Sequence, residues 1–97
     1  MNCYKKYKLP FTNIYVIKWN PKSITPIHSH PNVNCNFLVL SGTLQENIYN
    51  NLNKQGYYMI NSNIINKHQS SYINDEIGHH TIENLLDKPS WSIHYYK

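Results

Sequence analysis

The sequence predicts an all-β protein built from short strands. Runs rich in β-branched and aromatic residues recur along its 97 residues, and clusters of asparagine, proline and glycine separate them. No window shows the apolar spacing of three and four residues that marks an amphipathic helix. About seven or eight short strands with turn signals between them are typical of a β-sandwich or a small β-barrel.

Composition locates the strands of the first half. The expected strands are an aromatic and β-branched run, a short run that ends in histidine, an apolar run and a mixed run, at residues 14–19, 24–30, 35–40 and 43–49. Turns are expected at Asn20-Pro21, at Pro31 and at Gly42, because glycine tolerates the left-handed backbone of a tight turn. Residues 1–12 are expected to be an N-terminal segment, since Pro10 interrupts any early element.

The second half is expected to hold four shorter strands, at residues 57–60, 70–73, 79–85 and 91–96. An asparagine-rich connection is expected at residues 61–69, because asparagine is depleted in strands and favoured in turns. No repeat or linker divides the chain. A single domain is therefore expected over residues 1–97, with its barrel in residues 13–97.

The charge pattern argues against a nucleic-acid interface. The formal net charge is +4, and all nine positive side chains are lysines, with no arginine. Only Lys5, Lys6 and Lys8 form a cluster, and arginine is the side chain that most often reads bases. We therefore expect no nucleic-acid partner.

Cysteine usage and hydropathy predict a cellular location. The two cysteines, Cys3 and Cys35, are fewer than a secreted chain of this size usually carries. The N-terminus lacks the apolar region of a secretory signal, and no apolar run has the length of a membrane span. We expect a cytoplasmic protein with reduced thiols and no membrane association, and we expect it to be a monomer.

Two histidines two positions apart are the first candidate metal ligands. On a strand, side chains at positions i and i+2 point to the same face, so His28 and His30 could grip one metal ion. Strands that merely expose two histidines show the same pattern, and the pair alone leaves both interpretations open. Cys35 follows at the start of the next expected strand.

Two motifs in order resemble the paired motifs of the cupin superfamily. The first runs from His28 and His30 through Cys35 to Gly42, and the second is Asp75-x-x-Gly78-x-His80-x-x-x-Asn84. The resemblance implies a single cupin-type jelly-roll barrel that holds a metal ion. The two histidines of the first motif and the histidine of the second would be its ligands.

Two further histidines, His79 and His68, are expected to lie outside the metal site. Adjacent strand residues face opposite ways, so only one of His79 and His80 can face the interior. The motif spacing selects His80, which leaves His79 exposed, and His68 is expected to be solvated in a polar loop. Three neutral histidines would leave coordination positions open, as catalytic metal sites require.

Within that superfamily, the chain is similar to the cysteine dioxygenases, which are iron-dependent thiol dioxygenases. The strongest pieces of the similarity are Trp19, Ile27-His-Ser-His30, Cys35, Leu40 to Glu46, Ser71 to His80, Ile82-Glu-Asn84 and Ser92 to Tyr96. The resemblance implies that Fe²⁺ is bound by His28, His30 and His80. It also implies a thioether crosslink between Cys35 and Tyr96.

The last expected strand carries a candidate relay. Ser92, His94 and Tyr96 alternate along it, so they share one face, whereas Tyr95 points the other way. On these residues alone, an ordinary aromatic strand with a half-buried histidine fits as well. The family resemblance implies that the three form a hydrogen-bonded relay beside the iron, in a catalytic role.

The resemblance implies oxidation of L-cysteine to cysteine sulfinic acid by dioxygen. The family holds the substrate carboxylate with an arginine near the N-terminus, and Tyr4-Lys-Lys6 occupies that region here. Lys6 and Tyr4 are therefore the expected substrate-binding residues, although lysine lacks the two-pronged grip of arginine. Another small thiol or a peptide's N-terminal cysteine is an alternative substrate. A metal-binding cupin without turnover is the alternative outside the enzymes.

Overall fold

The computed structural model describes residues 3–28, 34–49, 58–73 and 78–97. Within these ranges the chain forms nine β-strands and no helix. The strands are β1 (Tyr4–Lys8), β2 (Ile14–Trp19), β3 (Ser23–Ile24), β4 (Cys35–Ser41), β5 (Thr43–Tyr49), β6 (Met59–Asn66), β7 (Ser70–Ile73), β8 (His79–Asn84) and β9 (Ser90–Tyr96). In the part of the chain described, no helix is long and apolar enough to cross a membrane.

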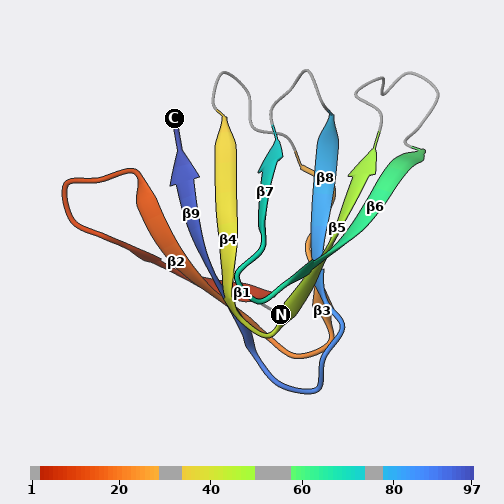
Figure 1. The fold of residues 1–97 in the computed structure, drawn as a ribbon, viewed down its shortest axis with the longest axis horizontal. Helices are drawn as coiled ribbons and strands as arrows, with labels where there is room; N and C mark the ends of the chain where they lie inside the picture. The colour runs from red at the N-terminus through yellow and green to blue at the C-terminus, as the bar shows by residue number, and fades with distance from the viewer. Residues whose placement is uncertain (1–2, 29–33, 50–57, 74–77) are drawn as a thin grey trace.

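The strands form two sheets that face each other (Figure 1). One sheet has five strands in the order β1-β2-β9-β4-β7, and the other has four in the order β3-β8-β5-β6. Neighbouring strands run antiparallel, and the last strand, β9, lies between β2 and β4. The predicted all-β fold is confirmed.

Side-chain alternation gives each sheet one buried face. On β4, Cys35, Phe37 and Val39 are buried, whereas Asn36 between them is exposed. The larger core cluster consists of Ile17, Trp19, Phe37, Val39, Leu44, Ile65 and Ile82. A smaller cluster of Cys35, Ile48 and Ile73, with Tyr96 packed against it, lies towards the end of the barrel where β4 begins and β9 ends.

The opposite end of the barrel is closed by a tight turn and a buried amide. Gly42 has φ +81°, and a Cβ at this position would collide with the hydroxyl of Ser90, so glycine is required in the β4–β5 turn. The Asn84 side chain is fully buried, and its amide nitrogen donates to the backbone carbonyls of Trp19, Asn20 and Lys88. Asn84 of the second motif therefore supports the fold at the end away from the histidines.

Most expected strands are confirmed, and three regions are corrected. Residues 4–8 form strand β1 of the five-stranded sheet, although they were expected to be an N-terminal segment outside the barrel, because their backbone pairs with β2 and Tyr4 packs on Trp19 with ring centroids 5.2 Å apart. The expected connection 61–69 is wrong over most of its length. There β6 pairs with β5 along an edge, and the backbone ladder outweighs the weak strand propensity of asparagine.

The third correction concerns the strand expected over residues 24–30. The strand β3 ends at Ile24, and Pro26, which has no backbone N–H to give to a ladder, follows. After hydrogen bonds between Thr25 and Ile82, the chain pairs with β8 again at an isolated bridge between His28 and His80. The turn expected at Pro31 lies outside the described residues.

Candidate functional site

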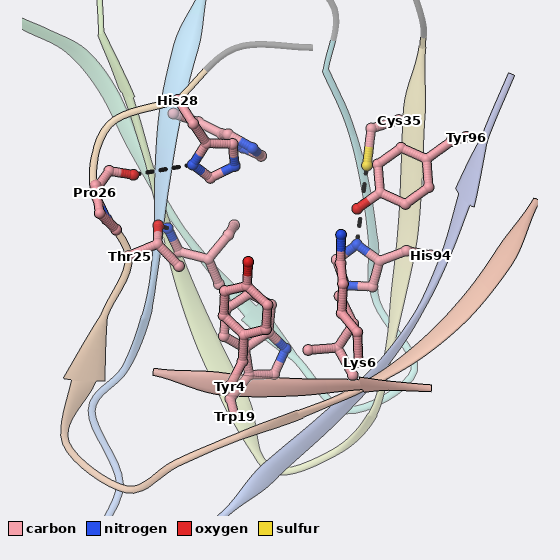
Figure 2. Close-up of a pocket in the computed structure, with 12 residues that line it drawn as sticks. Tyr4, Lys6, Trp19, Thr25, Pro26, His28, Cys35, His94 and Tyr96 are labelled. Carbon is pink, nitrogen blue, oxygen red and sulfur yellow. Dashed lines mark hydrogen bonds between the residues drawn. The ribbon is translucent and has the colours of Figure 1, made fainter. Parts of the chain in front are cut away.

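A cavity of about 290 Å³ opens between the two sheets (Figure 2). It is lined by Tyr4, Lys6, Ile17, Trp19, Thr25, Pro26, His28, Cys35, His80, Ile82, His94 and Tyr96. Figure 2 shows His28 on one side of the cavity and Cys35, Tyr96 and His94 on the other. The cavity therefore collects polar side chains from both sequence motifs within an otherwise apolar interior.

His28 and His80 lie side by side on one wall. Their ring centroids are 4.4 Å apart, and their backbones exchange two hydrogen bonds, of 3.1 Å from the His28 N–H and 2.9 Å from the His80 N–H. His80 is only 2% exposed, and His28 is half-buried. The isolated bridge thus holds one histidine from each motif against the other.

Both imidazoles have the same ring nitrogen committed to an acceptor. The Nδ1 of His28 lies 2.9 Å from the carbonyl oxygen of Pro26, and the Nδ1 of His80 lies 2.8 Å from Oε2 of Glu46. A carbonyl or carboxylate oxygen accepts, so Nδ1 carries the hydrogen in both rings and Nε2 is the nitrogen suited to bind a metal. Burial lowers the pKa of His28, partly opposed by its bond to Pro26, and keeps the ring neutral at pH 7.

This arrangement fits a metal centre. Histidine ligands usually donate their second ring N–H to a carbonyl or carboxylate, which fixes the tautomer and the orientation of the ring. His28 and His80 both meet that condition. The third predicted ligand, His30, lies outside the described residues, and within those residues no group of three histidine, cysteine or carboxylate side chains could hold an ion.

A buried chain of hydrogen bonds runs along β9 on the other wall. The indole N–H of Trp19 donates to Oγ of Ser92 at 2.8 Å, and the same Oγ is hydrogen-bonded to Nε2 of His94 at 2.6 Å. The Nδ1 of His94 faces Sγ of Cys35 at 3.9 Å. The His94 ring is also stacked on Phe37, with centroids 4.9 Å apart.

Cys35 and Tyr96 face each other across the β4–β9 ladder. They are register partners, and their side chains are joined by a hydrogen bond. Burial is the main cause that raises the pKa of the Cys35 thiol to about 11, and burial also raises the pKa of Tyr96. Both groups are therefore protonated at neutral pH. Tyr95 is 44% exposed on the opposite face, as predicted from the alternation.

Strand β1 brings a cation and a phenol to the same cavity. Lys6 and Tyr4 both line it, and Figure 2 shows both on the strand that crosses the lower end of the view. The Nζ atom of Lys6 lies 5.0 Å from the ring centroid of Tyr15 and 5.2 Å from that of Tyr96. These ring faces hold the ammonium group at the cavity by cation–π attraction.

Comparison with known proteins identifies the family to which the chain belongs. The sequence profile of the family described as cysteine dioxygenase type I matches residues 10–97. The chain belongs to the cysteine dioxygenase type I family. Human cysteine dioxygenase type 1 is 31% identical over 87 residues, and the bovine protein is 32% identical over the same length. The match covers 87% of this chain but 44% of each relative, so the chain spans less than half the length of these curated relatives.

Solved structures show that this member of the cysteine dioxygenase family has a cupin fold, as predicted. Oxalate oxidase in complex with the substrate analogue glycolate superposes with a TM-score of 0.68 at 18% identity, over 86% of this chain and 40% of that one. The CENP-C cupin domain of Drosophila melanogaster gives a TM-score of 0.70 at 10% identity, over 97% and 75% of the two chains. At these identities the comparison concerns the fold alone.

The predicted site residues that lie in the described ranges come together in the structure. All of them line the cavity except Ser92, which lies behind His94, and except His30, which is outside the described residues. His68 is exposed between β6 and β7, as expected. The expectation that His79 is exposed is wrong. It is half-buried, because β8 is an interior strand and Tyr49 stands opposite it in register.

The sequence did not predict the roles of Glu46, which contacts His80, and of Trp19, which lines the cavity. Glu46 holds His80, and Trp19 donates to the Ser92 hydroxyl. A signal for Glu46 was present, because it alternates with Leu44 and Ile48 on β5 and so occupies a core position. Its partner could not be identified from that signal alone.

Proposed function

We propose that this protein is an iron-dependent thiol dioxygenase that oxidises cysteine to cysteine sulfinic acid with dioxygen. The observation that carries the proposal is the pairing of His28 and His80 on one wall of a cavity, with Cys35 and Tyr96 on the other, in a member of the cysteine dioxygenase family. The curated relatives are named for that activity, and the same chemistry is proposed here for the shared region.

The metal ligands in this proposal are His28, His30 and His80. Neutral imidazoles suit ferrous iron, and three of them leave positions for other ligands. Bound iron would supply the activation of dioxygen towards the sulfur. The chain's own part is to present the two described imidazoles with their Nε2 atoms deprotonated, which the hydrogen bonds of Nδ1 to Pro26 and Glu46 support.

The cavity suits a small thiol. Its volume, about 290 Å³, lies at the small end of the range for ligand pockets. In the proposal, Lys6 at the edge of the cavity pairs with the substrate carboxylate, and Tyr4 borders the same opening. An unpaired carboxylate would be costly in a partly buried site, so this cation gives the pocket its preference for amino-acid thiols.

The relay on β9 would hold a phenol beside the reacting sulfur. The indole of Trp19 and the hydroxyl of Ser92 hold the His94 ring in place, and its Nδ1 faces Cys35 on the Tyr96 side of the cavity. The raised pKa of Tyr96 keeps its hydroxyl protonated, so that group can donate a hydrogen bond to substrate or dioxygen. A thioether between Cys35 and Tyr96 would lock that phenol in place.

The proposed reaction balances without a further reductant. A thiolate and one dioxygen molecule give a sulfinate, so both oxygen atoms end on sulfur, and the sulfur supplies the four electrons that reduce dioxygen. The protein's contribution is to bring sulfur and oxygen together in one orientation and to exclude bulk water.

A second candidate is oxidation of a different thiol, either a mercapto acid or a peptide's N-terminal cysteine. The observation in its favour is that the cation at the cavity edge is lysine, which orients a carboxylate less strictly than arginine does. A cupin that binds metal without turnover is the candidate outside the enzymes.

Oxygen consumption by the iron-loaded protein with a panel of thiols separates these candidates. The panel consists of L-cysteine, cysteamine, mercaptopropionate and a short peptide with an N-terminal cysteine. Uptake of one dioxygen per cysteine, with sulfinate identified by mass spectrometry, supports the first. Uptake with another member of the panel alone supports the second, and metal binding without uptake on any thiol rejects both.

A further inference from the structure

Glu46 places a carboxylate at a core position of β5, where apolar side chains are usual. It lies between Leu44 and Ile48 in the inward-facing phase of β5, and its exposed fraction is 0%. A carboxylate is almost never fully buried unless it is paired, because removing its charge from water is costly. Some partner inside the barrel must therefore offset that cost.

Two donors from opposite sheets meet this carboxylate. Oε2 accepts from Nδ1–H of His80 at 2.8 Å, and Oε1 accepts from the hydroxyl of Ser71 at 2.5 Å. His80 stands on β8 in the same sheet as Glu46, one diagonal step away, because its register partner on β5 is Ile48. Ser71 stands on β7 of the facing sheet. Glu46 is thus fixed from both sides of the barrel.

We propose that Glu46 positions His80 for the metal and supplies a negative charge that a ligand set of three neutral histidines lacks. The proposal rests on the proposed metal site. Since Nδ1 of His80 is held by a charged acceptor, the imidazole is a stronger donor at Nε2 than one bonded to a neutral carbonyl, as His28 is. The carboxylate also offsets one of the two charges of a divalent ion, so a single thiolate would neutralise the site.

The test measures metal affinity without turnover. Apo protein is titrated with Co²⁺ against a competing chelator, and the visible absorption of the bound ion is recorded. In Glu46→Gln the amide oxygen can still accept from His80 and the amide N–H₂ faces Ser71, so the shape is kept and the charge is lost. Loss of an outer partner of a metal ligand typically weakens metal binding by about 10- to 100-fold, and that loss is expected here.

A matched control separates this effect from a general change of charge. Glu83 is carried by β8 itself, three residues beyond His80 and on the opposite face, and it is outside the cavity lining. Glu83→Gln removes the same unit of charge and should bind Co²⁺ as the unchanged protein does. A purely structural role for Glu46 would lower the thermal stability of the apo protein but leave the affinity and spectrum of the folded fraction unchanged.

Ser71→Ala is the second variant, and it serves if Glu46→Gln does not fold. It keeps the carboxylate but removes one of its two donors, so a smaller loss of Co²⁺ affinity in the same direction is expected. Unchanged affinity in Glu46→Gln, or an equal loss in Glu83→Gln, overturns the role of Glu46 while the metal site stands. If the unchanged protein binds no Co²⁺, the proposed function fails and the role of Glu46 fails with it.

Discussion

Replacing Lys6 by alanine should remove the preference for cysteine over cysteamine, a thiol that lacks the carboxylate. Lys6 lines the cavity, and its ammonium group is held over the rings of Tyr15 and Tyr96 at 5.0 and 5.2 Å. A carboxylate on a substrate in the cavity would find this cation at the edge. No arginine exists in the chain to take its place.

The size of the effect follows from the exposure of Lys6. A hydrogen bond to a charged group contributes about 1.5–3 kcal/mol when it is well shielded from water. Because Lys6 is an exposed residue on β1, solvent screening favours the lower end of that range. The ratio of the two kcat/KM values, for cysteine and for cysteamine, should therefore fall roughly tenfold in Lys6→Ala.

The assay is steady-state oxygen uptake with each thiol, and Lys5→Ala is the matched control. Lys5 is adjacent on β1, its ammonium lies over Tyr7, and it does not line the cavity, so its loss changes net charge equally and should leave the ratio unchanged. Lys6→Arg should sharpen the preference, because guanidinium binds carboxylate with two parallel bonds. An unchanged ratio in Lys6→Ala, or an equal drop in Lys5→Ala, would show that Lys6 does not bind the carboxylate.

Three further predictions concern the cavity walls. His80→Ala should abolish most iron binding, measured as iron per chain, while His79→Ala should retain it; the reverse result would mean that the wrong face of β8 was assigned. Protein isolated after turnover should contain a fraction that has lost two hydrogens in intact-mass spectra, with peptide mapping to Cys35 and Tyr96; a bond at Tyr95 would contradict this. In uncrosslinked protein, the unfolded chain releases the Cys35 proton near pH 9 and the folded chain near pH 11. Stability present below pH 9 should therefore fall by up to about 3 kcal/mol as the pH rises to 11, and Cys35→Ser, which lacks the thiol, should not show that part of the loss in melting experiments.

The strands that the sequence located well are those whose signals are local. Residues 43–49 and 70–73 begin and end as expected, because turn residues flank β-branched or aromatic runs. Residues 61–66 of the edge strand β6 were expected to be a connection, because their asparagines are exposed and the strand is stabilised by pairing with β5, which composition does not reveal.

Motif spacing and strand alternation predict which side chains face the interior, but not the contacts between strands. The side chains of His80, Cys35, His94 and Tyr96 all line the cavity, since alternation fixes which face each residue takes. The contact of Glu46 with His80 was not predictable, because a diagonal pair depends on the register between β5 and β8. The local path at His28 also differed, since Pro26 ends the ladder before the histidine and leaves it on a single bridge.

Transfer of labelled oxygen tests the central claim most directly. The iron-loaded protein is supplied with L-cysteine and dioxygen labelled with the heavy isotope, in ordinary water, and the product is analysed by mass spectrometry. A dioxygenase built on His28, His30 and His80 places both labelled atoms in cysteine sulfinate, and His80→Ala forms none. Sulfinate that carries one atom from water, or a product that is only cystine, would contradict the proposed function.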